Sequence, residues 1–307
     1  MSKHVAVLMG GLSAEREVSL RSGAACAAAL EGEGYRVSRI DVGRDVAQVL
    51  AQLRPDACFN ALHGRWGEDG VVQGILEMLQ IPYTHSGVLA SALAMHKERA
   101  KAVMASAGVS VPRGVVVSRL DASKRHVLPP PYVVKPVNEG SSVGVIIVRE
   151  DRSHPPQELG RGDWAFGEQV LVENYVAGKE LTCAVMGDRA LGVIDILPAA
   201  GGFYDYDSKY AKGGSVHILP AEIKPNIYHQ VQQMALTAHQ ALGCRGVSRA
   251  DFRYDDRPDG TGELVCLEVN TQPGMTETSL VPELAAHAGL TFGELVRWMV
   301  EDASCDR

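Results

Sequence analysis

The sequence predicts an α/β protein built of more than one domain, and three observations support this prediction. Strand-like and helix-like segments alternate near the N-terminus, which is typical of a parallel sheet. Farther along the chain, short apolar runs separated by turn residues predict antiparallel strands. The chain has 307 residues, more than a single hydrophobic core usually supports, so we expect two or three subdomains that share a cleft.

The N-terminal region is predicted to form a β-α-β-α-β unit. Apolar runs and alternating apolar residues indicate strands, and apolar residues at helical spacing indicate helices. The five elements, in chain order, are Val5–Met9, Glu15–Leu30, Tyr35–Val42, Val46–Leu53 and Ala57–Leu62. Ligands of such a sheet bind at the carboxyl ends of its strands, so we expect the segments 10–15 and 63–70 to lie at a binding site.

The pattern changes after Pro82, and we place a domain boundary near residue 86. One long helix is predicted over Val88–Ala107, and it leads into a strand-rich stretch, Val109–Val176. Two antiparallel strands and an amphipathic helix are then expected at Glu180–Met186, Ala190–Leu197 and Asn226–Leu242. The glycine- and tyrosine-rich segment 201–214 offers little to a core and is predicted to be a lid.

Composition argues against several classes of protein. The formal net charge is −7, which disfavours nucleic acid as a partner because a phosphate backbone needs a basic face. No run approaches the roughly 18 apolar residues of a membrane span, and the apolar run at the N-terminus is too short for a signal peptide. The six cysteines lack C-x-x-C spacing, so we expect buried free thiols of a reducing compartment. The protein is therefore expected in the cytoplasm, with no membrane partner.

Two strand-like runs near the C-terminus flank Asp259-Gly260, a dipeptide that favours a two-residue hairpin turn. With that turn, Asp251 faces Glu268 and Arg249 faces Asn270 across the two strands. Because strand side chains alternate between faces, all four side chains are expected on one patch.

The oxygen atoms of this patch predict a metal site. Two carboxylates and one amide oxygen suit magnesium held jointly by protein and substrate phosphates. The alternative is an arginine–carboxylate salt bridge on a sheet surface. The neighbours favour the metal site, because Val265, Leu267 and Val269 place the opposite face in a core and Pro273-Gly274 leaves bare backbone for a ligand. An arginine beside metal-bound phosphate would neutralise charge that develops in a transition state.

A phosphate site is expected around Lys135. The sequence has no G-x-x-x-x-G-K-[ST] motif, so a P-loop is not supported. Instead, an apolar strand ends at Lys135 and leads into the small-residue loop 139–144, whose backbone N–H groups could surround an anion. Such a loop alone is more often a plain β-turn, but a lysine that closes an apolar strand needs an anionic partner. Lys97, taken alone, would be a solvated helix residue.

Six ordered motifs resemble those of the D-alanine–D-alanine ligase family over nearly the whole chain. They are Gly10–Glu15, His63–Gly70, Lys135–Pro136 with Glu139–Gly144, Tyr204–Tyr210, Arg249–Asp251 and Glu268–Leu280. The resemblance implies an ATP-grasp fold that follows a Rossmann-like, parallel-sheet domain, the pre-ATP-grasp domain. Residues 1–86 would form that domain with the first D-alanine site, 87–177 a central ATP-grasp subdomain, and 178–307 a C-terminal one with the metal site and the mobile loop.

The implied activity is ATP-dependent formation of D-alanyl-D-alanine for peptidoglycan. ATP would convert the first D-alanine into D-alanyl phosphate, the amine of the second would displace phosphate, and ADP and phosphate would be released. No Ser or Cys nucleophile is required, so catalysis would rest on positioning and charge stabilisation. The resemblance further implies a cytoplasmic homodimer that uses ATP, D-alanine and two Mg²⁺ ions, with Mn²⁺ as a substitute.

The resemblance also assigns nucleotide and metal ligands. ATP would be bound by Lys97 and Lys135 at the α- and β-phosphates, by Lys209 at the γ-phosphate, and by Glu173, Tyr175, Val176 and Glu180 at the adenine and ribose. The two metal ions would be held by Asp251, Glu268 and Asn270.

The reacting groups are assigned in the same way. Glu15 would bind the ammonium of the first D-alanine, with His63 nearby and with Ser141 and Tyr210 completing a hydrogen-bonded network. The oxyanion hole would be formed by Arg249 and the Gly274 N–H. The carboxylate of the second D-alanine would meet Ser279 and the Leu280 N–H.

Taken singly, some of these residues have simpler explanations. Glu15 could merely complement the dipole of its helix, and Ser13 could be only an N-cap. His63 could be a loop histidine whose partners all lie within the protein. His96 precedes Lys97 where the family commonly shows Asp, which leaves the local electrostatics of that helix open.

Three other functions compete with the ligase. A dinucleotide-binding oxidoreductase would use Gly10-Gly11 and Asp41, but the third glycine of G-x-G-x-x-G is missing. A non-catalytic ATP-binding module would not need Arg249 together with the full metal set. A ligase of the same fold that takes D-lactate or D-serine as second substrate is the nearest alternative, and Lys209 and Tyr210 favour the dipeptide over it.

Overall fold

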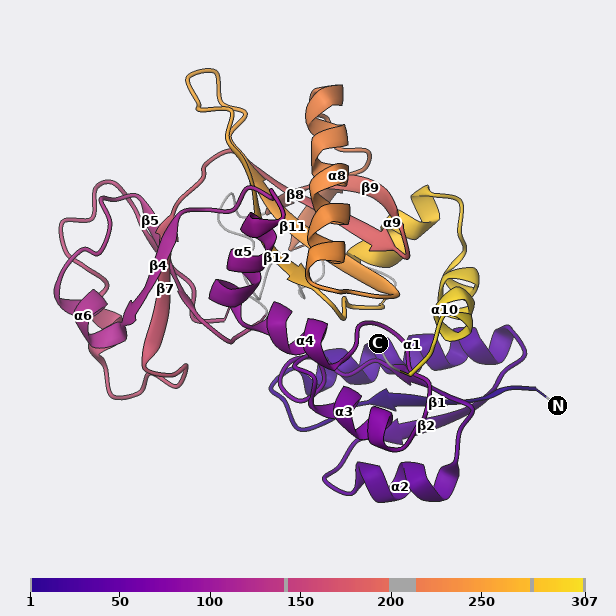
Figure 1. The fold of residues 1–307 in the computed structure, drawn as a ribbon. Helices are drawn as coiled ribbons and strands as arrows, with labels where there is room; N and C mark the ends of the chain where they lie inside the picture. Colours follow the sequence, from indigo (N-terminus) through magenta and orange to yellow (C-terminus); the bar gives the residue numbers. More distant parts are fainter. Residues whose placement is uncertain (1, 141–142, 199–213, 277–278, 306–307) are drawn as a thin grey trace.

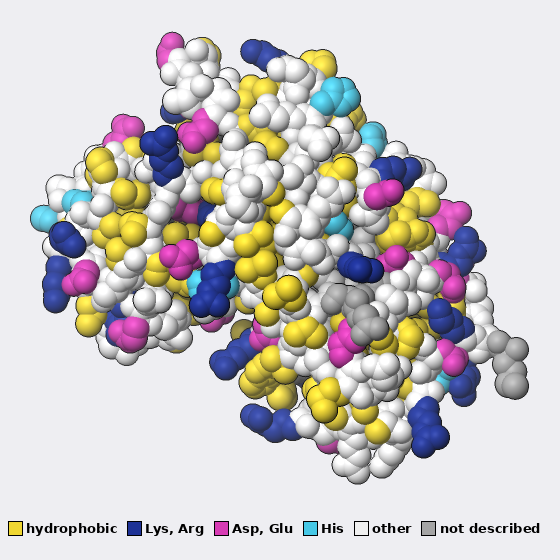
Figure 2. Space-filling view, viewed as in Figure 1, with side chains coloured by type: hydrophobic (Ala, Val, Ile, Leu, Met, Phe, Trp, Pro, Cys, Tyr) yellow, Lys and Arg dark blue, Asp and Glu magenta, His cyan; other side chains and the backbone are white. Residues whose placement is uncertain are grey.

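A computed structural model describes residues 2–140, 143–198, 214–276 and 279–305. Three sheets follow one another along the chain, and helices pack between and around them (Figure 1). On the face shown in Figure 2, acidic and basic side chains are interspersed. Within the described ranges, no helix is both long and apolar enough to cross a membrane. The predicted lid, apart from Gly214, lies outside the described residues.

The first sheet is parallel, with the strand order β2-β1-β3. Its elements are β1 (His4–Met9), α1 (Arg16–Gly32), β2 (Arg36–Asp41), α2 (Val46–Leu53), β3 (Ala57–Asn60) and α3 (Val71–Met78). Successive side chains of β1 alternate between two cores: Val5 and Val7 pack with α1, whereas Ala6 and Leu8 pack with α2 and α3. The predicted β-α-β-α-β unit is confirmed.

The single helix predicted over 88–107 is wrong, because two helices occupy this stretch: α4 (Val88–Met95) and α5 (Lys97–Ser106). His96 lies between them with an extended backbone (φ −93°, ψ 94°). It is the N-cap of α5, and its Nδ1 accepts a hydrogen bond from the Arg99 N–H at 3.4 Å. Aspartate, which the family commonly has here, is an ordinary N-cap that accepts such a bond with a carboxylate oxygen. His96 accepts it with a ring nitrogen instead. The break makes Lys97 the first residue of α5.

The second sheet is antiparallel, with the order β4-β7-β5-β6. Its elements are β4 (Gly114–Ser118), α6 (Arg119–Lys124), β5 (Tyr132–Pro136), β6 (Ile146–Val148), the 3-10 helix η1 (Gln157–Gly160) and β7 (Gln169–Asn174). Tyr132, Val134 and Val172 face a core that includes Ala122 of α6 and Leu159 of η1. The opposite face of β5 and β7 carries Lys135 and Glu173 together with Val133 and Leu171.

The third sheet is also antiparallel, with the order β10-β9-β8-β11-β12. Its elements are β8 (Lys179–Met186), β9 (Arg189–Pro198), β10 (Ser215–Ile218), α8 (Pro225–Ala241), β11 (Val247–Tyr254), β12 (Leu264–Asn270), α9 (Leu280–His287) and α10 (Phe292–Glu301). Helices α4, α5 and α8 cover one face of the sheet. Helices α9 and α10 cover the other, where they also meet β1 and α1.

The hydrophobic cores run across the predicted domain ranges 1–86, 87–177 and 178–307. Helices α4 and α5 share a core with the third sheet, and α9 and α10 share one with the first sheet. The ranges themselves stay a prediction. The shared cores hold the loops of the first sheet against the end of β12, and the candidate site lies there.

The cysteines are all free, as predicted, and five of the six are buried. Burial raises the pKa of Cys58, Cys183 and Cys244 to about 12. Thiols of this kind stay protonated and unreactive at neutral pH. They are core residues.

Candidate active site

A cavity of about 430 Å³ lies between the N-terminal sheet and the C-terminal part of the chain. It is lined by α1, the loops after β1 and β3, the start of α5, the start of β11, the end of β12 and the start of α9. It brings together nine of the predicted site residues: Glu15, His63, Lys97, Arg249, Glu268, Asn270, Gly274, Ser279 and Leu280. A smaller cavity of about 30 Å³ is lined by Lys135, Glu180 and Asp251 and shares Lys97, Glu139 and Glu268 with the first. The shared lining makes the two cavities neighbouring parts of one site.

Six predicted site residues are not among the lining residues. Glu173, Tyr175 and Val176 lie on or just after β7 and line neither cavity. Ser141, Lys209 and Tyr210 lie outside the described residues. The roles assigned to these six stay predictions.

The predicted pairing of the metal residues is confirmed: Asp251 faces Glu268 and Arg249 faces Asn270 across β11 and β12. The predicted two-residue turn is wrong, because the Asp255 N–H bonds to the Glu263 carbonyl and the connection is a longer loop. A β-bulge between Asp251 and Phe252 shifts the register by one residue. The bulge compensates for the longer loop at the site end of the hairpin.

Asp251 is held by three hydrogen bonds. The Arg249 guanidinium donates from Nε to Oδ1 at 2.8 Å and from Nη2 to Oδ2 at 2.7 Å. The hydroxyl of Thr182, a fully buried residue on the neighbouring strand β8, lies 2.7 Å from Oδ1. The arginine–carboxylate salt bridge considered above is thus present, and it sits at the edge of the cavity rather than on an open sheet surface.

The donor set fits a hard cation. Glu268 lies opposite Asp251, and the Oδ1 of Asn270 accepts a hydrogen bond from the Gln272 N–H at 2.8 Å, which fixes the amide. An amide oxygen has a second lone pair that remains available to a metal. Among the described residues there is no cluster of three or more His, Cys, Asp or Glu that could hold a metal. Two carboxylates and an amide therefore suit an ion that takes its other ligands from substrate phosphate and water.

Glu15 lies at the N-terminus of α1, but its side chain makes no capping hydrogen bond. Its carboxylate instead lies over the loop after β3: a Cβ at Gly64, where φ is +69°, would be 2.5 Å from Glu15 Oε2. Gly140 of the predicted phosphate loop lies on the same side, since a Cβ there would be 3.9 Å from the same oxygen. The carboxylate is therefore placed in the cavity between two glycine-containing loops.

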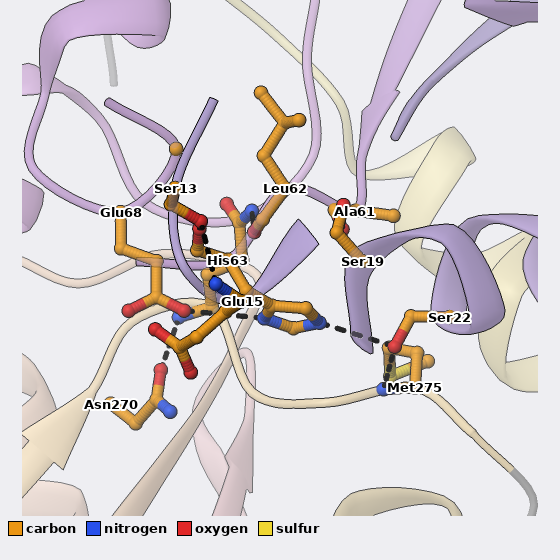
Figure 3. A network of polar contacts seen from close by, with 12 residues as sticks. Ser13, Glu15, Ser19, Ser22, Ala61, Leu62, His63, Glu68, Asn270 and Met275 are labelled. Carbon is orange, nitrogen blue, oxygen red and sulfur yellow. Dashed lines mark hydrogen bonds and ion pairs between the residues drawn. The ribbon is translucent and has the colours of Figure 1, made fainter. Parts of the chain in front are cut away.

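His63 is held on both sides by protein groups (Figure 3). Its Nδ1 lies 3.2 Å from Glu68 Oε1, and its Nε2 lies 3.1 Å from Ser22 Oγ. Ser22 Oγ also lies 3.4 Å from the Met275 N–H, which links α1 to the segment after β12. The simpler explanation, a histidine whose partners lie within the protein, thus holds for both ring nitrogens, although the ring lines the cavity.

The cavity is also lined by Gly274, Thr276, Ser279 and Leu280, at or just before the start of α9. Ser279 is the N-cap residue of α9, and its Oγ lies 2.9 Å from the Thr276 N–H and 2.8 Å from Thr276 Oγ1. A Cβ at Gly274 would be 3.0 Å from Ser279 Oγ, so glycine keeps this turn close. The first N–H groups of a helix have no partner within the helix, and Leu280 is the first residue of α9. This part of the lining can receive a carboxylate.

Arg21 is a lining residue that the sequence analysis did not identify. Val18, Arg21 and Ala25 recur at helical spacing on α1 and line the same cavity as Thr276 and Ser279. No hydrogen bond or ion pair joins the Arg21 side chain to a described residue. The helical spacing of these residues is visible in the sequence, but the sequence does not show that this side of α1 faces the cavity, because that depends on tertiary packing.

Two lysines lie on the side of the site where phosphates are predicted to bind. Lys97 Nζ donates to the Glu139 carbonyl and lies 3.9 Å from Glu268 Oε2. Lys135, at the end of β5, is ion-paired with Glu173. Burial alone would lower the pKa of Lys135, but Glu173, Glu268 and Glu180 outweigh burial and raise it. Lys135 is therefore cationic where phosphates are expected.

Arg253 contacts three of the four residues predicted to bind the adenine and ribose. Its guanidinium lies 3.3 Å from Glu180 Oε2, its Nε donates to the Val176 carbonyl at 3.0 Å, and its centre lies 5.8 Å from the Tyr175 ring centroid. Arg253 is not among the residues predicted from the sequence, although it lies two residues after Asp251 on the same face of β11.

Comparisons with known proteins point to one family. The family model described as D-ala D-ala ligase N-terminus matches residues 46–86, and the one described as D-ala D-ala ligase C-terminus matches residues 103–301. The chain is 75% identical over 307 residues to a D-alanine–D-alanine ligase of Methylobacterium radiotolerans, covering 100% of both chains. It is 67% identical over 306 residues to one of Sinorhizobium medicae, covering 100% of this chain and 99% of the relative.

A solved structure gives the same result for the fold. The D-alanine–D-alanine ligase from Bacillus anthracis complexed with ATP matches with a TM-score of 0.82 and 29% sequence identity. The match covers 98% of this chain and 97% of that one. The arrangement of the three sheets is therefore that of a protein solved with ATP.

Proposed function

Because this chain belongs to the D-alanine–D-alanine ligase family, whose members are ATP-dependent ligases, we propose that its central cavity is where two D-alanine molecules are joined. One observation carries the proposal. The cavity brings Glu15 of the N-terminal domain within one space with Arg249, Glu268 and Ser279 of the C-terminal sheet and helices. Groups that fit an ammonium, a phosphate and a carboxylate thus surround a volume of about 430 Å³.

The two D-alanine sites follow from the charges of the walls. Glu15 is placed to bind the ammonium of the first D-alanine, whose carboxylate then points toward Arg249 and Glu268. The Ser279 hydroxyl and the Leu280 N–H are placed to bind the carboxylate of the second. Arg21 adds a positive charge to the lining of the same cavity, and we assign it to that carboxylate as well.

The chain's own residues then position and stabilise the reacting groups. Lys97 and Lys135 hold the ATP phosphates in line with the carboxylate of the first D-alanine. Arg249 and the Gly274 N–H stabilise the oxyanion that forms when the second amine attacks D-alanyl phosphate. The amine loses a proton as the C–N bond forms, and phosphate leaves as the acyl C–O bond breaks.

The metal ligands of the proposal are Asp251, Glu268 and Asn270. Two Mg²⁺ ions, with Mn²⁺ as a substitute, would supply Lewis-acid neutralisation of the phosphoryl oxygens. The support from this chain is its oxygen-only donor set beside Lys97 and Lys135, with Asn270 fixed by Gln272.

Two of the competing functions lose support. A dinucleotide-binding site would need Asp41 for a ribose, but Asp41 is paired with Arg16 through two hydrogen bonds of 2.6 Å. A module that only binds ATP would not need Ser279 and Arg21 in the lining of this cavity. A ligase that uses D-lactate or D-serine as second substrate differs only in the amine or side chain of that substrate.

The decisive experiment measures phosphate release from ATP and Mg²⁺ with D-alanine, L-alanine, D-serine and D-lactate, each tested alone and the last three also with D-alanine. We expect rapid release with D-alanine alone and D-alanyl-D-alanine as the product. Faster release with D-alanine plus D-lactate or D-serine than with D-alanine alone would overturn the assignment of the second substrate.

The assembly and location of the protein also belong to the proposal. We propose a cytoplasmic homodimer, on the family resemblance. Light scattering coupled to size exclusion should give twice the mass of 32.9 kDa. A mass of one chain at micromolar concentration would contradict the dimer.

A further inference from the structure

Behind the proposed phosphate site lies a buried cluster of three charged side chains. Glu173 of β7 is 1% exposed, Lys101 of α5 is 6% exposed and Lys135 of β5 is 7% exposed. Each ammonium is paired with a different oxygen of the carboxylate: Lys135 with Oε1 and Lys101 with Oε2. These are the ion pairs that the structure gives for the three side chains. Burial lowers the pKa of Lys101, but its direct contact with the Glu173 carboxylate opposes burial and favours the charged ammonium. We therefore count two positive charges and one negative charge in the cluster.

The fold requires these three side chains to meet. In the β5–β7 ladder Glu173 faces Val133, two residues before Lys135, so Glu173 and Lys135 are diagonal neighbours on one face. Lys101 lies one helical turn after Lys97 on α5 and points to the same carboxylate. On the other side of Glu173 the strand β4 presents Gly114, where a Cβ would be 2.9 Å from the Glu173 Cβ. Glycine at 114 leaves the room that the glutamate needs.

Only one of the three side chains reaches the site. Lys135 lines the smaller cavity beside Asp251 and Glu268, whereas Lys101 and Glu173 line neither cavity. Both lysines lower the pKa of Glu173 in spite of its burial, which by itself would raise that pKa, so the carboxylate is ionised at neutral pH. An ionised Glu173 with no other partner would neutralise Lys135.

We propose that Lys101 is a positioning residue for ATP: by sharing Glu173, it leaves Lys135 with net positive charge for the phosphates. This inference rests on the proposed role of Lys135 in phosphate binding. With Lys101 present the cluster carries a charge of +1, from two lysines and one glutamate. Without Lys101 it carries zero. Without both Lys101 and Glu173 it carries +1 again, on Lys135 alone.

These three net charges predict the order of the ATP affinities of the variants. A side chain that only packs in the core would not give that order. Lys101→Met keeps the length of the side chain and removes its charge, and Glu173→Gln removes the charge of its partner. The affinity for ATP with Mg²⁺, and without D-alanine, is measured by calorimetry for the wild type, Lys101→Met, Lys101→Met/Glu173→Gln and Lys135→Met. Arg99→Met is the matched control, because Arg99 is an exposed cation on the same helix.

We expect Lys101→Met to weaken ATP binding about tenfold or more, the size of one charge-assisted hydrogen bond. The double variant should bind ATP more tightly than Lys101→Met does, since its charge returns to +1. Arg99→Met should bind as the wild type does. Thermal unfolding of each variant identifies any loss of fold.

The outcomes separate the two proposals. If Lys135→Met binds ATP as tightly as the wild type, the phosphate site itself is misplaced and the role of Lys101 falls with it. If Lys135→Met is weakened but Lys101→Met is not, only the inference about Lys101 fails. If the double variant binds no better than Lys101→Met, Lys101 acts through packing and the inference is likewise overturned.

Discussion

Thr182→Val tests whether Asp251 is a metal ligand that depends on its neighbours. Thr182 is fully buried on β8, and its hydroxyl lies 2.7 Å from Asp251 Oδ1 and 3.2 Å from the Ala250 carbonyl. The hydroxyl has one proton for these two acceptors, and the carboxylate is the stronger one. Valine has the shape of threonine but no donor, so the substitution removes this hydrogen bond and little else.

The expected effect follows from the energy of that bond. A hydrogen bond to a charged group contributes about 1.5–3 kcal/mol, and loss of such a partner typically weakens metal binding about 10- to 100-fold. Arg249 still holds Asp251 in the variant, so the carboxylate stays near its place but turns more freely. We expect the Mg²⁺ concentration for half-maximal activity to rise by about tenfold, toward the lower end of that range, because two of the three hydrogen bonds remain.

The assay is ADP formation at saturating ATP and D-alanine over a series of free Mg²⁺ concentrations. Thr182→Ser is the matched control, because it keeps the hydroxyl and loses only the methyl group. It should remain close to the wild type. The reasoning is refuted if Thr182→Val follows the wild-type Mg²⁺ curve, or if Thr182→Ser is impaired as much as Thr182→Val.

Three further predictions address other parts of the molecule. Asp251→Asn and Glu268→Gln should abolish ADP formation at saturating Mg²⁺ while the thermal unfolding midpoint stays within a few degrees; turnover near the wild-type rate in either variant would contradict the metal site. Arg21→Ala should raise the KM for the second D-alanine about three- to tenfold, the value of one hydrogen bond, and leave the KM for ATP unchanged; an equal rise in both would point to general damage. Burial holds the pKa of His239 at about 4, so the unfolded chain takes up a proton between pH 6.5 and 4 that the folded chain does not. Stability is therefore lost as the pH falls through that window, by about 2 kcal/mol between pH 7 and pH 5. His239→Gln should remove that part of the loss in urea unfolding at the two pH values, and an unchanged loss would show that His239 is not responsible.

Local periodicity was enough to predict most of the fold. The strands and helices around the first sheet could be predicted because a period of 2 places apolar residues on one face of a strand, and a period of 3.6 places them on one face of a helix. The break at His96 was missed, since histidine is a rare N-cap and the apolar pattern continues through it. Nothing in the flanking residues distinguishes a continuous helix from two helices that meet at an angle.

In the hairpin of β11 and β12, the pairing of the proposed metal ligands was predicted correctly although the predicted turn was wrong. Asp259-Gly260 favours a two-residue turn, but Asp255 accepts hydrogen bonds from Arg257 Nε at 2.7 Å and from the Thr261 N–H at 2.9 Å, and these bonds close a longer loop. The bulge beside Asp251 then restores the pairing that the short turn implied. The side chains of the loop, which the turn rule does not consider, decided its length.

The contact between the first sheet and the end of β12 could not be predicted from any single segment of the sequence, because it depends on hydrogen bonds between residues far apart in the chain. Gln272 is buried, its Oε1 accepts from Asn60 Nδ2 at 2.5 Å, and its Nε2 donates to the Leu62 carbonyl. Its backbone N–H fixes Asn270, one of the proposed metal ligands. An amide buried without partners would cost about 1–3 kcal/mol for each unsatisfied group, so Gln272 is tolerated only where Asn60 and Leu62 reach it. Those partners are more than 200 positions away in the sequence, at separations of 212 and 210 residues. The hydrogen bonds of Gln272 to Asn60 and Leu62 therefore also hold the loop of His63 against the hairpin of β11 and β12. The two halves of the site are thus positioned by polar groups that meet only when the whole chain has folded.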